Sequence, residues 1–100
     1  MAVVQNDRAH AEIVGALREG ARPSYVPGGT KICRLEVMCE GEVFSVVAMG
    51  EMADKAAGIS AKQRMRCRGR LTAHHWSSGD ATAHHHVQLI AEEIEVLNAR

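Results

Sequence analysis

The sequence predicts an all-β domain with one short helix. In several stretches hydrophobic and polar residues alternate with a period of two, as in strands that bury one face. Glycine, proline and acidic residues separate these stretches, and an alanine-rich segment at residues 50–58 interrupts them. A chain of 100 residues, 46% of them hydrophobic, can form one core but not two.

The N-terminal part predicts a strand followed by a loop. Alternation begins at His10 and continues to Leu17, with a glycine at residue 15 that lets the strand bend. Residues 20–30 hold two prolines and three glycines. We expect a loop there that carries Arg22 and Tyr25.

The middle of the chain predicts a hairpin and then the helix. Residues 32–38 and 43–49 are expected to be strands, joined by a tight turn at Glu40-Gly41. Residues 50–58 contain three alanines and end in glycine, which favours a helix of two turns with a glycine at its C-terminal cap.

The most clearly two-sided stretch runs from Lys62 to Trp76 and predicts the next strand. Its small apolar side contains Met65 and Cys67. The other side carries Arg64, Arg66, Arg68, Arg70, Thr72, His74 and Trp76. Four like charges on one face repel one another, which favours an anionic partner, although a solvated outer face is the equally plausible alternative.

A turn at residues 76–80 and a last strand within residues 82–97, with a phase shift at residues 91–93, complete the pattern. Five strands with a helix between the third and fourth predict an OB-fold, a five-stranded Greek-key barrel. The alternatives are another small barrel or a sandwich. We expect a flexible N-terminus over residues 1–9, the OB-fold domain over 10–97 and a short C-terminal end at 98–100.

The net charge is zero with histidines neutral, which argues against a protein that coats duplex DNA. Charge is nevertheless segregated, since residues 62–70 hold five positive residues and no negative ones. The acidic cluster of Glu92, Glu93 and Glu95 is expected on another surface. A basic track leading to an exposed tryptophan is typical of single-strand binding, with charge for the backbone and a ring for a base.

No catalytic constellation is found, so an enzyme is not expected, and no cofactor is implied. Cys33, Cys39 and Cys67 include no Cys-x-x-Cys pair, which argues against disulfides and zinc and favours a reducing cytoplasm. The sequence shows no signal peptide and no long apolar run, so no membrane association is expected. The histidines His74, His84 and His86 are more consistent with contacts to phosphates or bases than with a metal site.

Four segments, taken in order, resemble the bacterial single-stranded DNA-binding protein family, including its primosomal replication protein N-type members. They are Ile13-Val14-Gly15-Ala16-Leu17, Pro27-Gly28-Gly29-Thr30-Lys31-Ile32, the run from Phe44 to Ala53, and the run from Arg68 to Trp76. The Gly-x-Leu segment followed five residues later by tryptophan is the most specific. The resemblance covers about residues 10–97.

The resemblance implies a cytoplasmic, nucleoid-associated OB-fold that binds single-stranded DNA in replication, recombination and repair. It also implies a homodimer or homotetramer, with contact through the first strand, and possible replication or repair proteins as partners. Val43 and Met49 stand where the family often has stacking aromatics, so weaker binding is expected. No acidic tail follows Arg100, which fits a short accessory member better.

The candidate nucleic-acid-binding residues are Arg34, Arg64, Arg66, Arg68, Arg70, His74, Trp76, Tyr25 and Met49. For Tyr25, packing over the barrel end is favoured over base stacking, and Phe44 is expected in the core. The alternative function is an OB-fold module for oligomerisation or protein interaction in replication restart. RNA binding also remains open, because stacking and phosphate contacts do not reject a 2′-hydroxyl.

Overall fold

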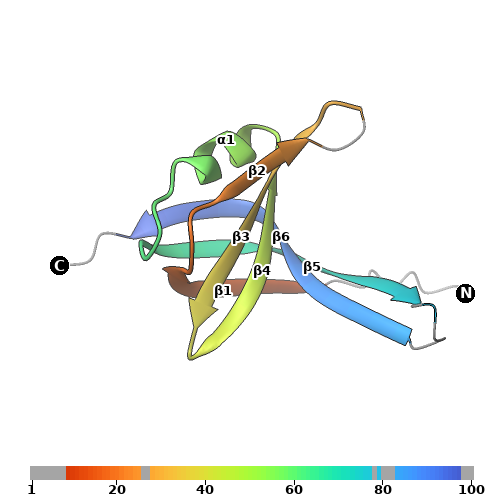
Figure 1. The fold of residues 1–100 in the computed structure, drawn as a ribbon. Helices are drawn as coiled ribbons and strands as arrows, with labels where there is room; N and C mark the ends of the chain where they lie inside the picture. Colours follow the sequence, from red (N-terminus) through yellow and green to blue (C-terminus); the bar gives the residue numbers. More distant parts are fainter. Residues whose placement is uncertain (1–8, 26–27, 78, 80–82, 98–100) are drawn as a thin grey trace, which may run out of the picture.

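The computed structural model describes residues 9–25, 28–77, 79 and 83–97, and in residues 22, 74–77 and 83–85 only the backbone. Most of the predicted flexible N-terminus, and the C-terminal end, lie outside these ranges. The elements are β1 (His10–Leu17), β2 (Arg22–Tyr25), β3 (Lys31–Cys39), β4 (Glu42–Met49), α1 (Glu51–Ala57), β5 (Arg64–Ser77) and β6 (Ala83–Leu97), as shown in Figure 1.

The strands form one sheet that closes on itself. Its order is β1-β5-β6-β4-β3-β2, and β1 also pairs with β3, so five strands make a closed barrel and β2 lies outside the ring. The link between β4 and β6 is parallel and short, at Val46–Leu89 and Val47–Ile90. With α1 between the third and fourth barrel strands, the all-β, OB-fold-like architecture predicted from the sequence is confirmed.

The prediction of a loop at residues 22–25 is wrong. These residues form β2, which pairs with β3 from Arg22–Arg34 to Tyr25–Lys31. In the described sheet β2 is an edge strand. An edge strand tolerates Pro23 because the missing N–H is not needed on the solvent side. The predicted hairpin turn is confirmed, since Cys39 pairs with Glu42 across the two intervening residues.

Two glycines allow the barrel to close. A Cβ on Gly15 would lie 2.1 Å from the carbonyl oxygen of Met38, where β1 meets β3. A Cβ on Gly69 would lie 2.0 Å from the carbonyl oxygen of Ile90. Both distances are far below van der Waals contact, so β1 and β5 approach their neighbours only because these positions lack a side chain.

A β-bulge in β6 confirms the predicted phase shift at residues 91–93. Arg68 pairs with Glu93 and Gly69 pairs with Ala91, which leaves Glu92 as the extra residue. The bulge changes which positions of β6 face outward. Before it the even-numbered residues face out, and after it the odd-numbered residues do.

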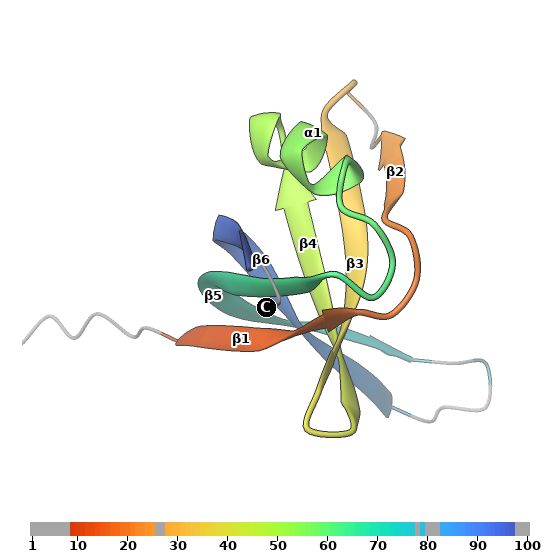
Figure 2. The same cartoon turned by 90° about the vertical axis from the view of Figure 1, so that its left-hand side faces the viewer.

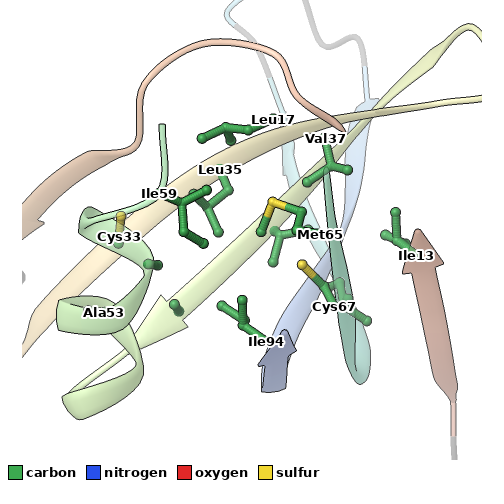
Figure 3. Close-up of a cluster of buried hydrophobic side chains, with 14 residues drawn as sticks. Ile13, Leu17, Cys33, Leu35, Val37, Ala53, Ile59, Met65, Cys67 and Ile94 are labelled. Atoms are coloured by element: carbon green, nitrogen blue, oxygen red, sulfur yellow. The ribbon is translucent and has the colours of Figure 1, made fainter. Parts of the chain in front are cut away.

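The core fills the barrel and is covered at one end by α1 (Figure 3). Small residues of the helix, Ala53 and Ala56, are fully buried against the strands. Met65 and Cys67 on the inner side of β5 are also fully buried. Burial raises the pKa of the Cys67 thiol from 9.0 to about 11, because the thiolate is poorly solvated there. Among the described residues, α1 is too short to span a bilayer.

Two hairpins extend beyond the closed ring (Figures 1 and 2). The β5–β6 hairpin continues as an arm past Leu89, so that Leu89 is 1% exposed whereas Val87 is 52% exposed. The β3–β4 hairpin likewise extends past Val46. Phe44, predicted to be a core residue, is therefore 40% exposed although it has the same strand parity as the buried Val46 and Ala48.

Candidate nucleic-acid interface

The arginine strand has two different sides, as predicted. Residues 64–70 lie in β5, with Met65 and Cys67 fully buried. The arginines between and beside them point outward, Arg64, Arg68 and Arg70 being exposed and Arg66 partly buried. The fold therefore places the four guanidinium groups on the outer surface of the barrel.

Carboxylates from both neighbouring strands lie beside the middle of this row. Nη1 of Arg66 donates a hydrogen bond to Oε1 of Glu95 at 2.8 Å, and its Nε lies 3.7 Å from Oε2 of Glu12. Nη1 of Arg68 is 3.1 Å from Oε2 of Glu93, and its Nε is 3.6 Å from the same Glu12 oxygen. We call these five residues the ion-pair ladder.

The prediction that the acidic cluster lies on another surface is therefore wrong for Glu93 and Glu95. The β6 bulge places both on the outward face, directly opposite Arg68 and Arg66. Glu12 comes from β1, where it pairs with Arg68 in register. The repulsion expected among adjacent arginines is thus relieved inside the protein, by alternating charge across three strands.

The ladder leaves little net positive charge on this surface. The ladder itself contains two arginines and three glutamates. When Arg64 and Arg70, which form no ion pair among the described residues, are added, this face carries one net positive charge. The paired side chains are 43–66% exposed, so water screens them and each pair contributes about 0.2–1 kcal/mol to stability. Arg66 and Arg68 would have to exchange these partners to bind phosphate.

A second arrangement joins β5 to the opposite side of the barrel. In register, Arg70 pairs with Ile90, Ile90 with Val47, and Val47 with Arg34. Residues in register lie on the same face, so these four form one row across β5, β6, β4 and β3. We call it the cross-barrel row. Neither Arg34 nor Arg70 forms an ion pair with any described residue.

Met49 pairs with Ile32 and lies on the same outer face as Arg34, whereas Tyr25 pairs with Lys31 and lies on the other face of β2 and β3, towards α1. Tyr25 is 69% exposed and does not pack over the barrel end, contrary to the favoured prediction. Its position at the end of an edge strand, paired only with Lys31, explains this. Met49 is 43% exposed and pairs with Ile32 on β3. Asp54 accepts a hydrogen bond from the Lys31 ammonium, which raises the pKa of Lys31.

The backbone of His74 and Trp76 belongs to the arm, where they pair with His86 and His84. Their side chains lie outside the described part, so base stacking by Trp76 stays a prediction. The same holds for the histidine cluster, of which only the His86 side chain is described. Among the described side chains, no group of three potential metal ligands is found.

Sequence reasoning missed the partners on neighbouring strands. Glu12 was not singled out, nor were Val47 and Ile90 of the cross-barrel row. The predicted phase shift did contain part of the signal, because a one-residue shift before Glu93 moves it and Glu95 to the face of the arginines. Val47 and Ile90 have no such signal, since their role depends on the short parallel contact between β4 and β6.

No family model matches this chain, and no curated protein matches it either.

Proposed function

We propose that this protein binds single-stranded DNA, without catalysis, during replication, recombination or repair in the cytoplasm. Its arginines contact phosphates, and Trp76 stacks on a base. Exposed apolar groups at Tyr25 and Met49 offer further contact surfaces. Stacking platforms beside positive charge are the usual means of holding single strands.

The cross-barrel row is the observation that carries this proposal. Arg34 and Arg70, without ion-pair partners among the described residues, stand at the ends of an apolar strip formed by Val47 and Ile90. Three strand spacings separate the two arginines, about 14 Å along the surface. Charge at both ends of an apolar strip suits a flexible chain with phosphates on one side and bases on the other. The outer face of these strands is also where OB-folds bind oligonucleotides.

Titration with an unstructured oligonucleotide tests the proposal. Quenching of the fluorescence of Trp76, the single tryptophan, is the expected signal. The logarithm of the affinity should fall linearly with the logarithm of salt concentration, with a slope of about −0.7 per neutralised phosphate. Trp76→Ala should lower the affinity about tenfold or more, equivalent to the loss of one stacking contact. An affinity independent of salt, or unchanged in Trp76→Ala, would contradict the proposal.

A protein-interaction or oligomerisation module is the second candidate, favoured by an apolar groove. Its lining includes Ile13, Phe44, Leu71 and Val87, and its volume is about 450 Å³. β1 pairs with β3 only at residues 16 and 17, so in the described sheet its earlier residues pair on one edge alone. An open strand edge beside an apolar groove favours pairing with another chain.

Sedimentation separates the two candidates. Phe44→Ser should reduce assembly to a dimer or tetramer and spare oligonucleotide binding if the groove is an interface. Trp76→Ala should weaken oligonucleotide binding and leave assembly unchanged if DNA binding is the function. Loss of assembly in Trp76→Ala, with DNA affinity unchanged, would favour the interaction module over DNA binding.

A further inference from the structure

A cavity of about 150 Å³ opens on the outer face of β3, β4 and β6, next to the cross-barrel row. Its lining includes Arg34, Glu36, Ser45, Val47, His86 and Gln88. A cavity of this volume holds one six-membered ring, and because its mouth is open a two-ring base can enter by one edge with the rest of the base at the mouth. Because it is much smaller than the 300–1,000 Å³ usual for larger ligands, it suits one planar group rather than an extended molecule.

The cavity combines an apolar floor with polar walls. Val47 is 7% exposed and forms part of the floor, and it is the cross-strand partner of Arg34. Glu36 lies two residues further along β3, about 7 Å away on the same face. Ser45 is the cross-strand partner of Glu36. A guanidinium and a carboxylate thus stand on the same side of one strand, beside a buried apolar residue.

Both charged groups retain hydrogen-bonding capacity. Arg34 has no ion pair with any residue whose side chain is described, so its planar fork of donors is available. Glu36 contacts Arg18 at 3.8 Å, with both side chains about half exposed, which is a weak pair. A backbone hydrogen bond of 2.8 Å from Arg18 N to Glu36 O fixes the neighbouring turn, whose Glu19 and Gly20 form the rim.

We propose that this cavity selects guanine, as a base-specific subsite within the proposed binding of single-stranded DNA, on which the inference rests. Guanine presents two adjacent acceptors, O6 and N7, which match the guanidinium fork of Arg34. It also carries N–H donors at N1 and N2, which the Glu36 carboxylate accepts. A duplex leaves O6 and N7 exposed in the major groove but uses N1–H for base pairing, so only an unpaired guanine offers both sets of groups at once.

The other bases fit this donor and acceptor set less well. Adenine has an amino group where guanine has O6, and would place a donor against Arg34. Thymine lacks the amino group from which Glu36 would accept a hydrogen bond. Cytosine also has two adjacent acceptors and an amino group, so it is the nearest competitor. The cavity therefore predicts a preference for guanine at one position of an otherwise sequence-tolerant site.

Oligothymidylates of about 12 nucleotides, within the range of one OB-fold site, are suitable probes. One central thymidine is replaced by dG, dA or dC, and the affinity of each labelled oligonucleotide is measured by fluorescence anisotropy. The dG oligonucleotide should bind about tenfold more tightly than the parent, as expected for one bidentate arginine contact. The dA and dC oligonucleotides should remain within about threefold of the parent.

Amino-acid substitutions then test whether the preference for dG arises in this cavity. Arg34→Lys keeps the charge but removes the fork, and it should reduce the dG-to-dT affinity ratio to near one. Glu36→Gln should lower the same ratio. The matched control is Arg64→Lys, an exposed arginine outside the cavity, which should leave the ratio unchanged.

The outcomes distinguish this inference from the proposed function. Equal affinity for all four oligonucleotides, or a preference for another base, overturns the guanine site while single-strand binding stands. A guanine preference that survives Arg34→Lys overturns its assignment to this cavity. Absence of binding to every oligonucleotide overturns both.

Discussion

The ion-pair ladder and the cross-barrel row both contain outward-facing arginines, but these arginines have different neighbours in the two regions. In the ladder, Arg66 and Arg68 lie among carboxylates of β1 and β6. In the row, Arg34 and Arg70 are separated by apolar residues and have no ion pair among the described residues. A run of arginines along one strand therefore does not establish an anion-binding track, since the register of the neighbouring strands decides which charges remain available.

The largest expected effect concerns the close approach of β5 and β6 that positions the ladder. Gly69→Ala places a methyl group 2.0 Å from the Ile90 carbonyl oxygen, which the backbone cannot avoid without moving. We expect a loss of about 3 kcal/mol or more in the free energy of unfolding, or failure to fold. Gly20→Ala is the matched control, because no atom lies within 4 Å of its added Cβ. Equal unfolding midpoints in urea for the two variants would contradict the close contact.

Alkaline pH should weaken the region beneath the ladder before it weakens the Lys31–Asp54 pair. The pKa of Cys67 rises from 9.0 to about 11 on folding, so above pH 9 the unfolded chain loses this proton first. The free energy of unfolding should therefore fall between pH 9 and about 11, by an amount on the order of 2 kcal/mol. Cys67→Ala should remove this decrease, as measured by urea unfolding at several pH values.

Lys31 supplies the comparison within the same titration. Its pKa is raised from 10.5 chiefly by the hydrogen bond to Asp54, so its contribution is present below pH 10.5 and is lost as the pH rises through the raised value. Lys31→Met should leave the decrease that begins near pH 9 in place. If Lys31→Met abolished that early decrease, burial of Cys67 would not be its cause.

The available arginine should contribute more to DNA affinity than the paired one. Oligothymidylate offers no guanine, so Arg34 is available to a phosphate there, and Arg34→Gln should weaken binding about fivefold and reduce the salt slope by about 0.7. Arg68→Gln should change both by less than half as much, because Arg68 must first leave Glu12 and Glu93. A larger effect for Arg68→Gln than for Arg34→Gln would contradict this prediction and would mean that the arginines of β5 contact the phosphates.

The smallest expected effect measures the ladder itself. Arg66→Ala loses contacts to Glu12 and Glu95 and should lower the free energy of unfolding by about 0.5–1 kcal/mol more than Arg64→Ala. Arg64 is a suitable control because it lies on the same face of β5 without an ion pair among the described residues. The difference should shrink in high salt, and identical urea midpoints would mean that the ladder is not stabilising.

Local patterns predicted most of the barrel correctly. Alternation located β1, β3, β4 and β5, and the alanine-rich segment located α1. The extra residue at the bulge was also visible as a phase shift. The short strand β2 was missed because Pro23 and the neighbouring glycines favour a loop, and only pairing with β3 makes it a strand. Phe44 was misplaced because parity says which face a residue occupies but not where the barrel ends.

The sequence by itself determined which residues alternate, where the chain turns and that β5 carries its arginines on one side, because these depend on near neighbours along the chain. The tertiary structure alone decided which of those charges are neutralised and which side chains surround the cavity. Glu12, Arg68 and Glu93 are brought together from three strands, and so are Arg34, Ser45 and Gln88. Such contacts depend on strand register and barrel closure, which couple residues far apart in the chain.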